Sequence, residues 1–264
     1  MEKIKNYSYI GLIKELSLTD FKLKYQGSFF GYLWSLTKPL MLFSVLYFVF
    51  TRFFKLGGSI PNYPVYLLLG IVLFNYFIES TMASMGSIVG KGDLIRKVYF
   101  PRIILTISTS ITALITLFLN LIVVFIFMIF SKVMPPVDAP LFLLLLVELF
   151  ILTSGVSLFL ASLFVRFRDI AHIWEVCNQV LFYAVPIIYP LSFVPQKIGK
   201  ILLLNPLAQI IQDSRYVLIT DKSTIASTIL PFPYIFIPYL LPFFIFAIGY
   251  WFFQKSAAKF AEEV

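Results

Sequence analysis

The sequence has 264 residues, of which 60% are hydrophobic and only 13% are charged. Soluble domains contain about 45–50% apolar and about 25% charged residues, so this composition excludes a water-soluble globular protein. The net charge of +8 does not indicate nucleic-acid binding, because basic loops between apolar spans are what the positive-inside rule produces in membrane proteins.

The first segment with a helical pattern covers residues 8–25. Its apolar residues fall on one face at 3.6 residues per turn, whereas Lys14, Glu15 and Lys22 fall on the other. The apolar face consists of Tyr9, Leu12, Ile13, Leu16 and Leu23. We expect an amphipathic helix on the cytoplasmic surface of a membrane, within an interface region at residues 1–30. The same stripe would also fit a helix packed against a soluble partner.

Six apolar runs follow, each close to the roughly 20 residues that a helix needs to cross a bilayer. They cover residues 31–53, 63–89, 103–130, 141–165, 173–189 and 231–253. The predicted fold is an all-α integral membrane protein, with one domain over residues 1–264. Its six transmembrane helices form a bundle at 31–253, and a cytoplasmic tail follows at 254–264.

Proline residues divide the stretch between the fifth and sixth spans. The apolar pieces at 198–204 and 207–219 are each too short to cross a membrane. Irregular backbone at membrane depth is tolerated only where protein or water covers it. We therefore expect a re-entrant helical pair that lines a pathway.

The distribution of Lys and Arg sets the orientation of the bundle. Fourteen of the 21 basic residues fall on the side of the two termini, and seven fall on the other side. This asymmetry predicts that both termini lie in the cytoplasm, which agrees with an even number of spans.

No motif supplies a catalytic, nucleotide or metal site. Only three residues separate Gly86 from Gly90 where a phosphate-binding loop needs four, and Gly92 stands where that loop needs Ser or Thr. His172 and Cys177 are the sole residues of their types and cannot make a metal site. We expect no catalytic residue, no metal and no cofactor in this chain. A membrane-embedded glycan-processing enzyme would need paired carboxylates at one depth, and the sequence does not show such a pair.

Three glutamates lie in or at the edges of apolar runs: Glu79, Glu148 and Glu175. An ionised carboxylate there costs at least a few kcal/mol unless it faces water or a partner. Glu79 is the strongest candidate for a pathway residue, because Asn75 precedes it by one helical turn on the same face. Glu148 and Glu175 fit protonated or snorkelling side chains equally well.

Aromatic residues make up 18% of the chain, and most of them must face lipid or pack in the bundle. Phe30, Tyr32 and Trp34 gather at the start of the first span, and Tyr183 and Tyr189 lie along the fifth. Aromatic faces suit the C–H faces of sugar rings. We expect these five residues and Glu79 to line a channel.

Three blocks, in order over roughly 190 residues, resemble the permeases of bacterial polysaccharide ABC exporters that serve O-antigen, capsule and teichoic acid. The blocks are Asp20–Tyr25 with Gly31–Trp34 and Lys38–Leu40; Leu94–Arg102; and Val165–Asp169 through Pro186–Pro190 to Leu204–Leu207. The resemblance implies the transport subunit of an ATP-driven complex rather than an enzyme. This subunit would export lipid-linked polysaccharide, O-antigen first, across the bacterial inner membrane. An exporter of the same architecture that moves a drug or a lipid is the alternative.

The resemblance also implies partners and site residues. The chain would pair with a second copy of itself, with membrane lipids and with two copies of a separate ABC ATPase that binds ATP and Mg²⁺. The loop after the second span would couple to that ATPase, with Asp93 as a helix cap, Leu94 and Ile95 as apolar anchors, and Arg96 and Lys97 as charge partners. These basic residues also fit simple topology determinants. The phosphate of the lipid carrier would lie near Lys22, Lys24, Arg166 and Arg168.

Overall fold

The computed structural model describes residues 9–58, 60–258 and 260, and this part of the chain folds into helices without a strand. The α-helices are α1 Tyr9–Tyr25, α2 Trp34–Arg52, α3 Tyr63–Met85, α4 Gly92–Lys97, α5 Ile103–Phe130, α6 Phe142–Arg166, α7 Ile170–Ala184, α8 Gln196–Leu203, α9 Pro206–Leu218, α10 Ala226–Ile229 and α11 Phe236–Ala257. The expected interface region and tail, 1–30 and 254–264, fall partly outside the described residues at 1–8, 259 and 261–264.

Five of these helices are long and apolar enough to cross a membrane: α2 with the turn before it, α3, α5, α6 with the turn before it, and α11. Helix α3 is the centre of the bundle, because 78% of its most apolar window is buried, against 17% for α2 and 22% for α11. The exposed sides of α2 and α11 carry large apolar residues. Such a surface is compatible with lipid and not with water.

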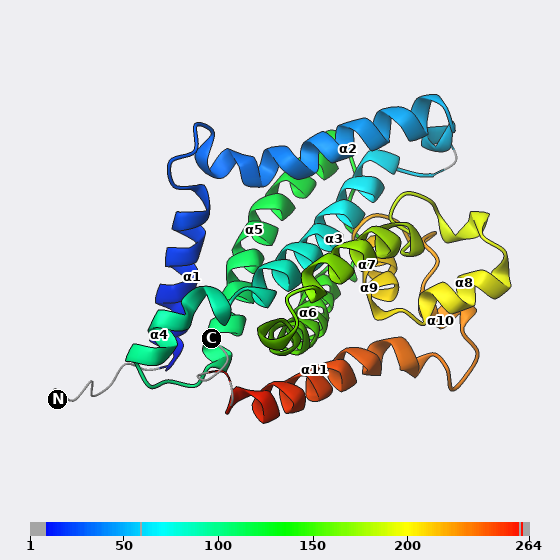
Figure 1. Ribbon diagram of the computed structural model, residues 1–264. Coiled ribbons are helices and arrows are strands. Elements are labelled where there is room, and N and C mark those ends of the chain that lie inside the picture. Colours follow the sequence, from blue (N-terminus) through cyan, green and yellow to red (C-terminus); the bar gives the residue numbers. More distant parts are fainter. Residues whose placement is uncertain (1–8, 59, 259, 261–264) are drawn as a thin grey trace.

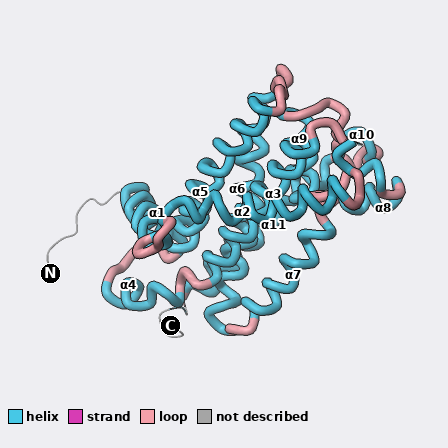
Figure 2. Tube along the Cα trace, turned by 90° about the horizontal axis from the view of Figure 1, so that it is seen from above, coloured by secondary structure: helices cyan, strands magenta, loops and turns pink. Residues whose placement is uncertain are grey.

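The long helices run between two ends of the molecule. Helices α1 and α4 and the C-terminal end of α11 lie together at one end, and α8, α9 and α10 lie at the other (Figure 1). The view from above shows the same separation of α1 and α4 from α8 and α10 (Figure 2). We call these the α1 end and the α9 end of the bundle.

The prediction of six spanning helices differs from the structure at the fifth span, residues 173–189. This segment forms α7, which has 15 residues and is roughly 22 Å long at 1.5 Å per residue. Val185 after it is extended, because a residue that precedes a proline, here Pro186, is disfavoured in the helical region. Helix α7 therefore falls short of the roughly 30 Å thickness of a bilayer core.

The two apolar pieces at 198–204 and 207–219 form α8 and α9, as the helical pattern predicts. The side chain of Asn205 accepts a hydrogen bond from the backbone N–H of Leu207 and caps α9, and Pro206 occupies its first position. Helix α9 is buried along almost its whole length between α3, α6 and α11.

A single buried side chain, Arg215 of α9, ties that helix to its neighbours. Its guanidinium donates hydrogen bonds to the carbonyl oxygens of Tyr66 at 3.1 Å and Ile187 at 2.7 Å, and to that of Pro186 at 2.5 Å. It also lies 3.5 Å from the ring centroid of Tyr66. These contacts fix the position of α9 against α3 and the loop that follows α7.

The sequence pattern predicts that helix α1 lays its apolar face on a membrane surface. In the structure, much of this face packs against the bundle instead. Leu12, Ile13 and Leu16 are half-buried in an apolar cluster of the bundle. Ser17 is buried on α5, where its hydroxyl donates to the carbonyl oxygen of Ser108 at 3.0 Å. Tyr9 and Leu23 remain exposed. The helix therefore has the predicted apolar face, but three of its five apolar residues contact the protein itself.

Candidate functional site

A cavity of about 950 Å³ lies between α1, α2, α3 and α5. Its walls come from the end of α1, the first half of α2, the second half of α3 and the first half of α5. These portions lie toward the α1 end, so the cavity occupies that half of the bundle (Figure 1). Both apolar and polar side chains therefore line this cavity.

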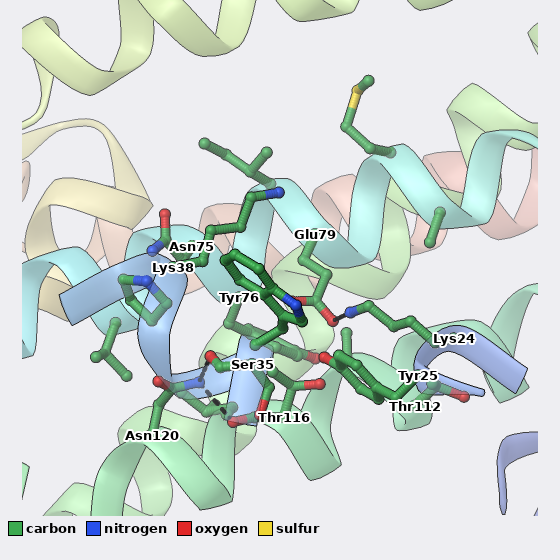
Figure 3. A pocket seen from close by; sticks show the side chains of 18 of the residues that line it. Lys24, Tyr25, Ser35, Lys38, Asn75, Tyr76, Glu79, Thr112, Thr116 and Asn120 are labelled. Carbon is green, nitrogen blue, oxygen red and sulfur yellow. Dashed lines mark hydrogen bonds and ion pairs between the residues drawn. The ribbon is translucent and has the colours of Figure 1, made fainter. Parts of the chain in front are cut away.

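Two charged residues of the cavity wall, Lys24 and Glu79, form an ion pair that joins α1 to α3 (Figure 3). Burial lowers the pKa of the Lys24 ammonium, but the Glu79 carboxylate raises it through charge attraction and a hydrogen bond, and the net shift is upward. Lys24 therefore stays positively charged at neutral pH. The pair also explains how Glu79 is tolerated in an apolar helix.

A second lysine, Lys38 of α2, lines the same cavity near Asn75 of α3 (Figure 3). Lys38 has no ion-pair partner among the described residues. It is therefore a positive group available for an anionic or hydroxyl-rich ligand. Asn75 and Glu79 share the wall, as their spacing of four residues predicts.

The α5 wall is polar along one stripe. Asn120 donates from Nδ2 to the carbonyl oxygens of Ser35, at 3.2 Å, and Thr116, at 2.9 Å. Thr112 donates to the carbonyl oxygen of Ser17 at 3.1 Å. A wall with amide and hydroxyl groups at helical spacing offers several weak polar contacts instead of one strong one.

The aromatic residues expected to line a channel do not share one wall. Trp34 lines the cavity. Phe30 packs edge-on against Trp34 with ring centroids 5.4 Å apart, and Tyr32 stacks on Phe21 at 5.2 Å, so both lie beside the cavity in the turn between α1 and α2. Tyr183 is exposed on α7, and Tyr189 donates to its carbonyl oxygen at 3.0 Å.

The four basic residues expected at a lipid phosphate are also divided. Only Lys24 lines the cavity, whereas Lys22 is exposed on α1. Arg166 ends α6, and the guanidinium of Arg168 lies 5.1 Å from the ring centroid of Phe164. Arg166 and Arg168 therefore lie at the end of α6 and in the turn that leads to α7, at the α1 end of the bundle.

The expected coupling segment forms the short helix α4 at the α1 end (Figure 1). Asp93 does not cap this helix, because it lies inside it, and the capping position is occupied by Lys91 without a side-chain cap. Asp93 lies in the first turn of α4 instead, where its negative charge interacts favourably with the helix dipole. Lys91 forms an ion pair of 2.5 Å with Asp20 of α1.

The two residues predicted as apolar anchors of this segment, Leu94 and Ile95, contact the bundle itself. Leu94 and Ile95 are half-buried against the chain's own apolar cluster, so they hold α4 on the bundle. The exposed residues are Asp93, Arg96, Lys97, Val98 and Tyr99. Tyr99 is fully exposed, which is a costly position for an aromatic ring unless a partner covers it.

Lys38, Asn120 and Tyr99 are site residues that reasoning from the sequence did not select. A lysine inside an apolar span is a signal of function by itself, and Lys38 meets that description. Asn120 gives a similar but weaker signal in the middle of the apolar run 103–130. For Tyr99 the sequence carries no signal, because exposure of one ring depends on how the loop packs.

Comparison with known proteins gives one family and several relatives. The model of the ABC-2 type transporter family matches residues 12–219. An "O-antigen export system permease protein RfbA" of Klebsiella pneumoniae is 30% identical over 260 residues, which cover 97% of this chain and 96% of that protein. A second Klebsiella pneumoniae protein of that name is 28% identical over 262 residues. A Myxococcus xanthus protein of that name is 29% identical over 206 residues, or 77% of this chain and 78% of that protein.

Proposed function

We propose, on the premise that this chain belongs to the ABC-2 type transporter family, that it exports lipid-linked O-antigen polysaccharide across the inner membrane. The names of its relatives support O-antigen as the substrate class. The chain is the transport subunit, and a separate ATPase binds ATP and Mg²⁺ and supplies the energy.

The observation that carries this proposal is the cavity at the α1 end. It is large enough for several sugar units, since ligand sites of about 300–1,000 Å³ hold drug-sized molecules. Its wall combines one tryptophan with amides, hydroxyls and Lys38, which forms no ion pair within the described part of the chain. This mixture suits a hydroxyl-rich polymer with an anionic end better than a purely apolar drug.

Lys24 and Lys38 are the candidates for contact with the carrier phosphate. Both lysines line the cavity, and Lys38 has no carboxylate partner in the part of the chain described. An arriving phosphate would compete with Glu79 for Lys24. Binding of the carrier would thereby release the contact between α1 and α3, and this release is the first step that we propose for opening. Lys22, Arg166 and Arg168, at the same end, would attract the anion before it enters.

Six crossings and two cytoplasmic termini make up the proposed topology. Helix α7 together with residues 185–190 leads from the α1 end to the α9 end, so this segment is the fifth crossing although its helix is short. Helices α8 and α9 form the re-entrant pair and the gate on the far side. The α1 end faces the cytoplasm, as the distribution of Lys and Arg predicts.

Two copies of the chain and two ATPase subunits form the proposed transporter. Exposed aromatic and apolar residues such as Tyr183 of α7 and Trp251 of α11 are available to lipid or to a second copy. Phe30, Tyr32, Tyr183 and Tyr189, which do not reach the cavity within one chain, would complete the wall of a channel between the two copies.

Helix α4 and the residues after it are the proposed contact with the ATPase. Arg96, Lys97 and Tyr99 are exposed there, and exposed aromatic and arginine side chains dominate binding energy at protein interfaces. The ion pair between Lys91 and Asp20 would pass movement of α4 to α1, whose Lys24 lies in the cavity wall.

Deletion of this gene in its host tests the substrate class. We expect lipid-linked O-antigen to accumulate on the cytoplasmic face and to disappear from the cell surface, with restoration by the wild-type chain. Normal surface O-antigen in the deletion strain would reject the proposed substrate and leave the family assignment unaffected.

A further inference from the structure

A second pocket, of about 290 Å³, lies at the α9 end of the bundle and shares no lining residue with the cavity at the α1 end. The turn before α3, the start of α3, the segment after α7, α9 and the loop after α9 all contribute to its wall. Its volume is close to the lower limit of ordinary ligand sites, which is roughly 300 Å³. The pocket therefore has room for one small ligand and not for a length of polymer.

Gln212 of α9, which is only 1% exposed, presents a fixed hydrogen-bond donor to this pocket. Its Oε1 accepts from Nη1 of Arg215 at 2.9 Å and from the hydroxyl of Tyr66 at 3.4 Å. A guanidinium can only donate, so the amide oxygen has to face Arg215. Nε2 of Gln212 therefore points away from Arg215, and it has no hydrogen-bond partner among the described residues. Because Gln212 lines the pocket, its two N–H groups are available to a ligand.

The loop after α9 is held in a hydrogen-bonded turn on the opposite side of the pocket wall. The N–H of Thr220 donates to the carbonyl oxygen of Arg215 at 3.1 Å, and the N–H of Ser223 donates to the carbonyl oxygen of Thr220 at 3.2 Å. Oγ of Ser223 is buried without a partner in the part of the chain described. A buried hydroxyl normally has a partner, and a ligand hydroxyl in the pocket supplies one.

Lys222 gives this pocket a positive charge. Its side chain is exposed and lines the pocket, so it lies where the pocket opens. It forms no ion pair with any described residue. The described residues of the wall include no carboxylate, and Asp221, the neighbour of Lys222, is exposed and outside the wall. The pocket therefore favours a ligand with a negative charge.

We propose that this pocket binds one acidic sugar unit, a hexose that carries a carboxylate or phosphate group. Lys222 contacts the anionic group, whereas Nε2 of Gln212 and Oγ of Ser223 contact hydroxyls. Pro61 and Pro190 in the wall offer apolar surface to the C–H face of the ring. The inference rests on the proposed function for the source of the sugar, which is the exported glycan on the exit side, beside the helix assigned to the gate.

A bare anion is the competing ligand, and the depth of the polar groups favours the sugar. Lys222 at the mouth is sufficient to attract an anion by charge alone. Gln212 is buried and held in one orientation by Arg215, so its donor serves a ligand that enters the pocket. A ligand with hydroxyls on several sides satisfies both the mouth and the interior.

The test uses the full-length chain in phosphatidylcholine nanodiscs, with glucuronate, glucose and inorganic phosphate as probes. Saturation-transfer-difference NMR measures binding of the two sugars, with nanodiscs that lack the chain as the baseline. We expect saturable binding of glucuronate, about tenfold tighter than that of glucose, because a hydrogen bond to a charged group is worth about that factor. Phosphate should displace glucuronate only at much higher concentration than glucuronate itself requires.

Two variants locate the site. Lys222→Gln and Gln212→Glu should each weaken glucuronate binding about tenfold. Gln212→Glu keeps an oxygen for Arg215 and Tyr66 and so preserves the fold, but it replaces the donor amide by a second carboxylate oxygen. Lys222→Arg should retain binding. Lys197→Gln, an exposed lysine of α8 at the same end but outside the wall, is the matched control and should bind as wild type.

Absence of glucuronate binding, unchanged binding in both Lys222→Gln and Gln212→Glu, or displacement by phosphate as effective as by glucuronate would overturn the sugar site. These measurements involve no transport, so their failure is distinct from failure of the export proposal. Loss of surface O-antigen on gene deletion without sugar binding rejects the pocket alone. Normal surface O-antigen with sugar binding retained rejects the exported glycan as the source.

Discussion

Lys24 and Glu79 join α1 to α3 in the wall of the cavity. Their side chains are 38% and 29% exposed, and partly exposed ion pairs contribute about 0–1 kcal/mol to stability. The pair therefore has little effect on folding, and its importance lies in which groups the cavity offers to a ligand.

Glu79→Lys places two positive charges in contact and should reduce export strongly while lowering the melting temperature only slightly. The exchange Lys24→Glu with Glu79→Lys restores the attraction and should recover part of the export, measured as surface polysaccharide. Glu175→Gln, on the exposed face of α7, is the matched control and should behave as wild type. Equal loss in the single and the exchanged variant would show that the pair itself does not matter.

Arg215 is expected to act on stability instead. Arg215→Met removes the donors from the carbonyl oxygens of Tyr66, Pro186 and Ile187, and each buried acceptor left without a partner costs about 1–3 kcal/mol. We expect a loss of roughly 3 kcal/mol or more in nanodisc unfolding. Arg215→Lys should not rescue it, because an ammonium cannot reach three separate acceptors in the same way. Arg168→Lys, in an exposed turn, serves as the control, and a wild-type melting temperature for Arg215→Met would contradict this role.

Sequence reasoning predicted part of the residue-scale picture. Glu79 and Asn75 share a wall because a spacing of four residues in a helix puts them on one face. Lys24 as the partner of Glu79 was not predictable, since 55 residues separate them and only the packing of α1 on α5 brings them together. The packing of Leu94 and Ile95 on the bundle was not predictable either, because the pattern does not tell whether an apolar residue meets its own chain or a partner.

Helices α6 and α11 approach most closely at two glycines, Gly155 and Gly249. A Cβ on Gly155 would lie 2.6 Å from Cα and 2.7 Å from the backbone nitrogen of Phe246, which are backbone atoms that cannot move aside. Gly249 faces the backbone of Gly155 in the same way. Small residues at such crossings let membrane helices pack on each other's backbones.

Gly155→Ala should therefore destabilise the bundle by about 1–3 kcal/mol, the usual cost of an overpacked core. Gly11→Ala in α1 is the control, because nothing lies within 4 Å of its added Cβ, and it should be neutral or stabilise by up to about 1 kcal/mol. Thermal melting of both variants in nanodiscs measures the difference. Equal melting temperatures would mean that α6 and α11 can separate at no cost.

For α4, the exposed side chains are expected to carry the contact with the ATPase. Tyr99→Ala and Arg96→Ala should lower the ATPase activity that the permease stimulates and the amount of ATPase that co-purifies, with little change in melting temperature. Leu94→Asp, in contrast, should lower the melting temperature, because Leu94 packs in the apolar cluster. Full ATPase recovery with Tyr99→Ala and Arg96→Ala combined would place the contact elsewhere on the chain.

At the scale of elements, apolar runs predicted five of the crossing helices well, because length and composition are local properties. The fifth span was predicted to continue to residue 189, but the helix ends at Ala184, because the proline at 186 disfavours the helical conformation of the residue before it and the apolar run by itself continues past it. Helices α8 and α9 could be placed from their prolines, but the burial of α9 between three other helices arises from long-range packing.

For the whole molecule, composition alone determined the class of protein, and the order of motifs indicated the family that the comparisons confirm. A chain of this class works across a membrane, so its central property is the direction and identity of what it moves. Two copies, two ATPases and the glycan are proposals that only an assembled system can test.

Transport by the reconstituted complex is the most direct test of the account. The chain and its ATPase are placed in vesicles whose outer face corresponds to the cytoplasm, together with lipid-linked O-antigen and, separately, an apolar dye. We expect ATP to drive the glycan into the lumen, where a glycan-cleaving enzyme added outside no longer reaches it, and to leave the dye where it was. ATP-driven movement of the dye, with the glycan still accessible outside, would contradict a polysaccharide exporter.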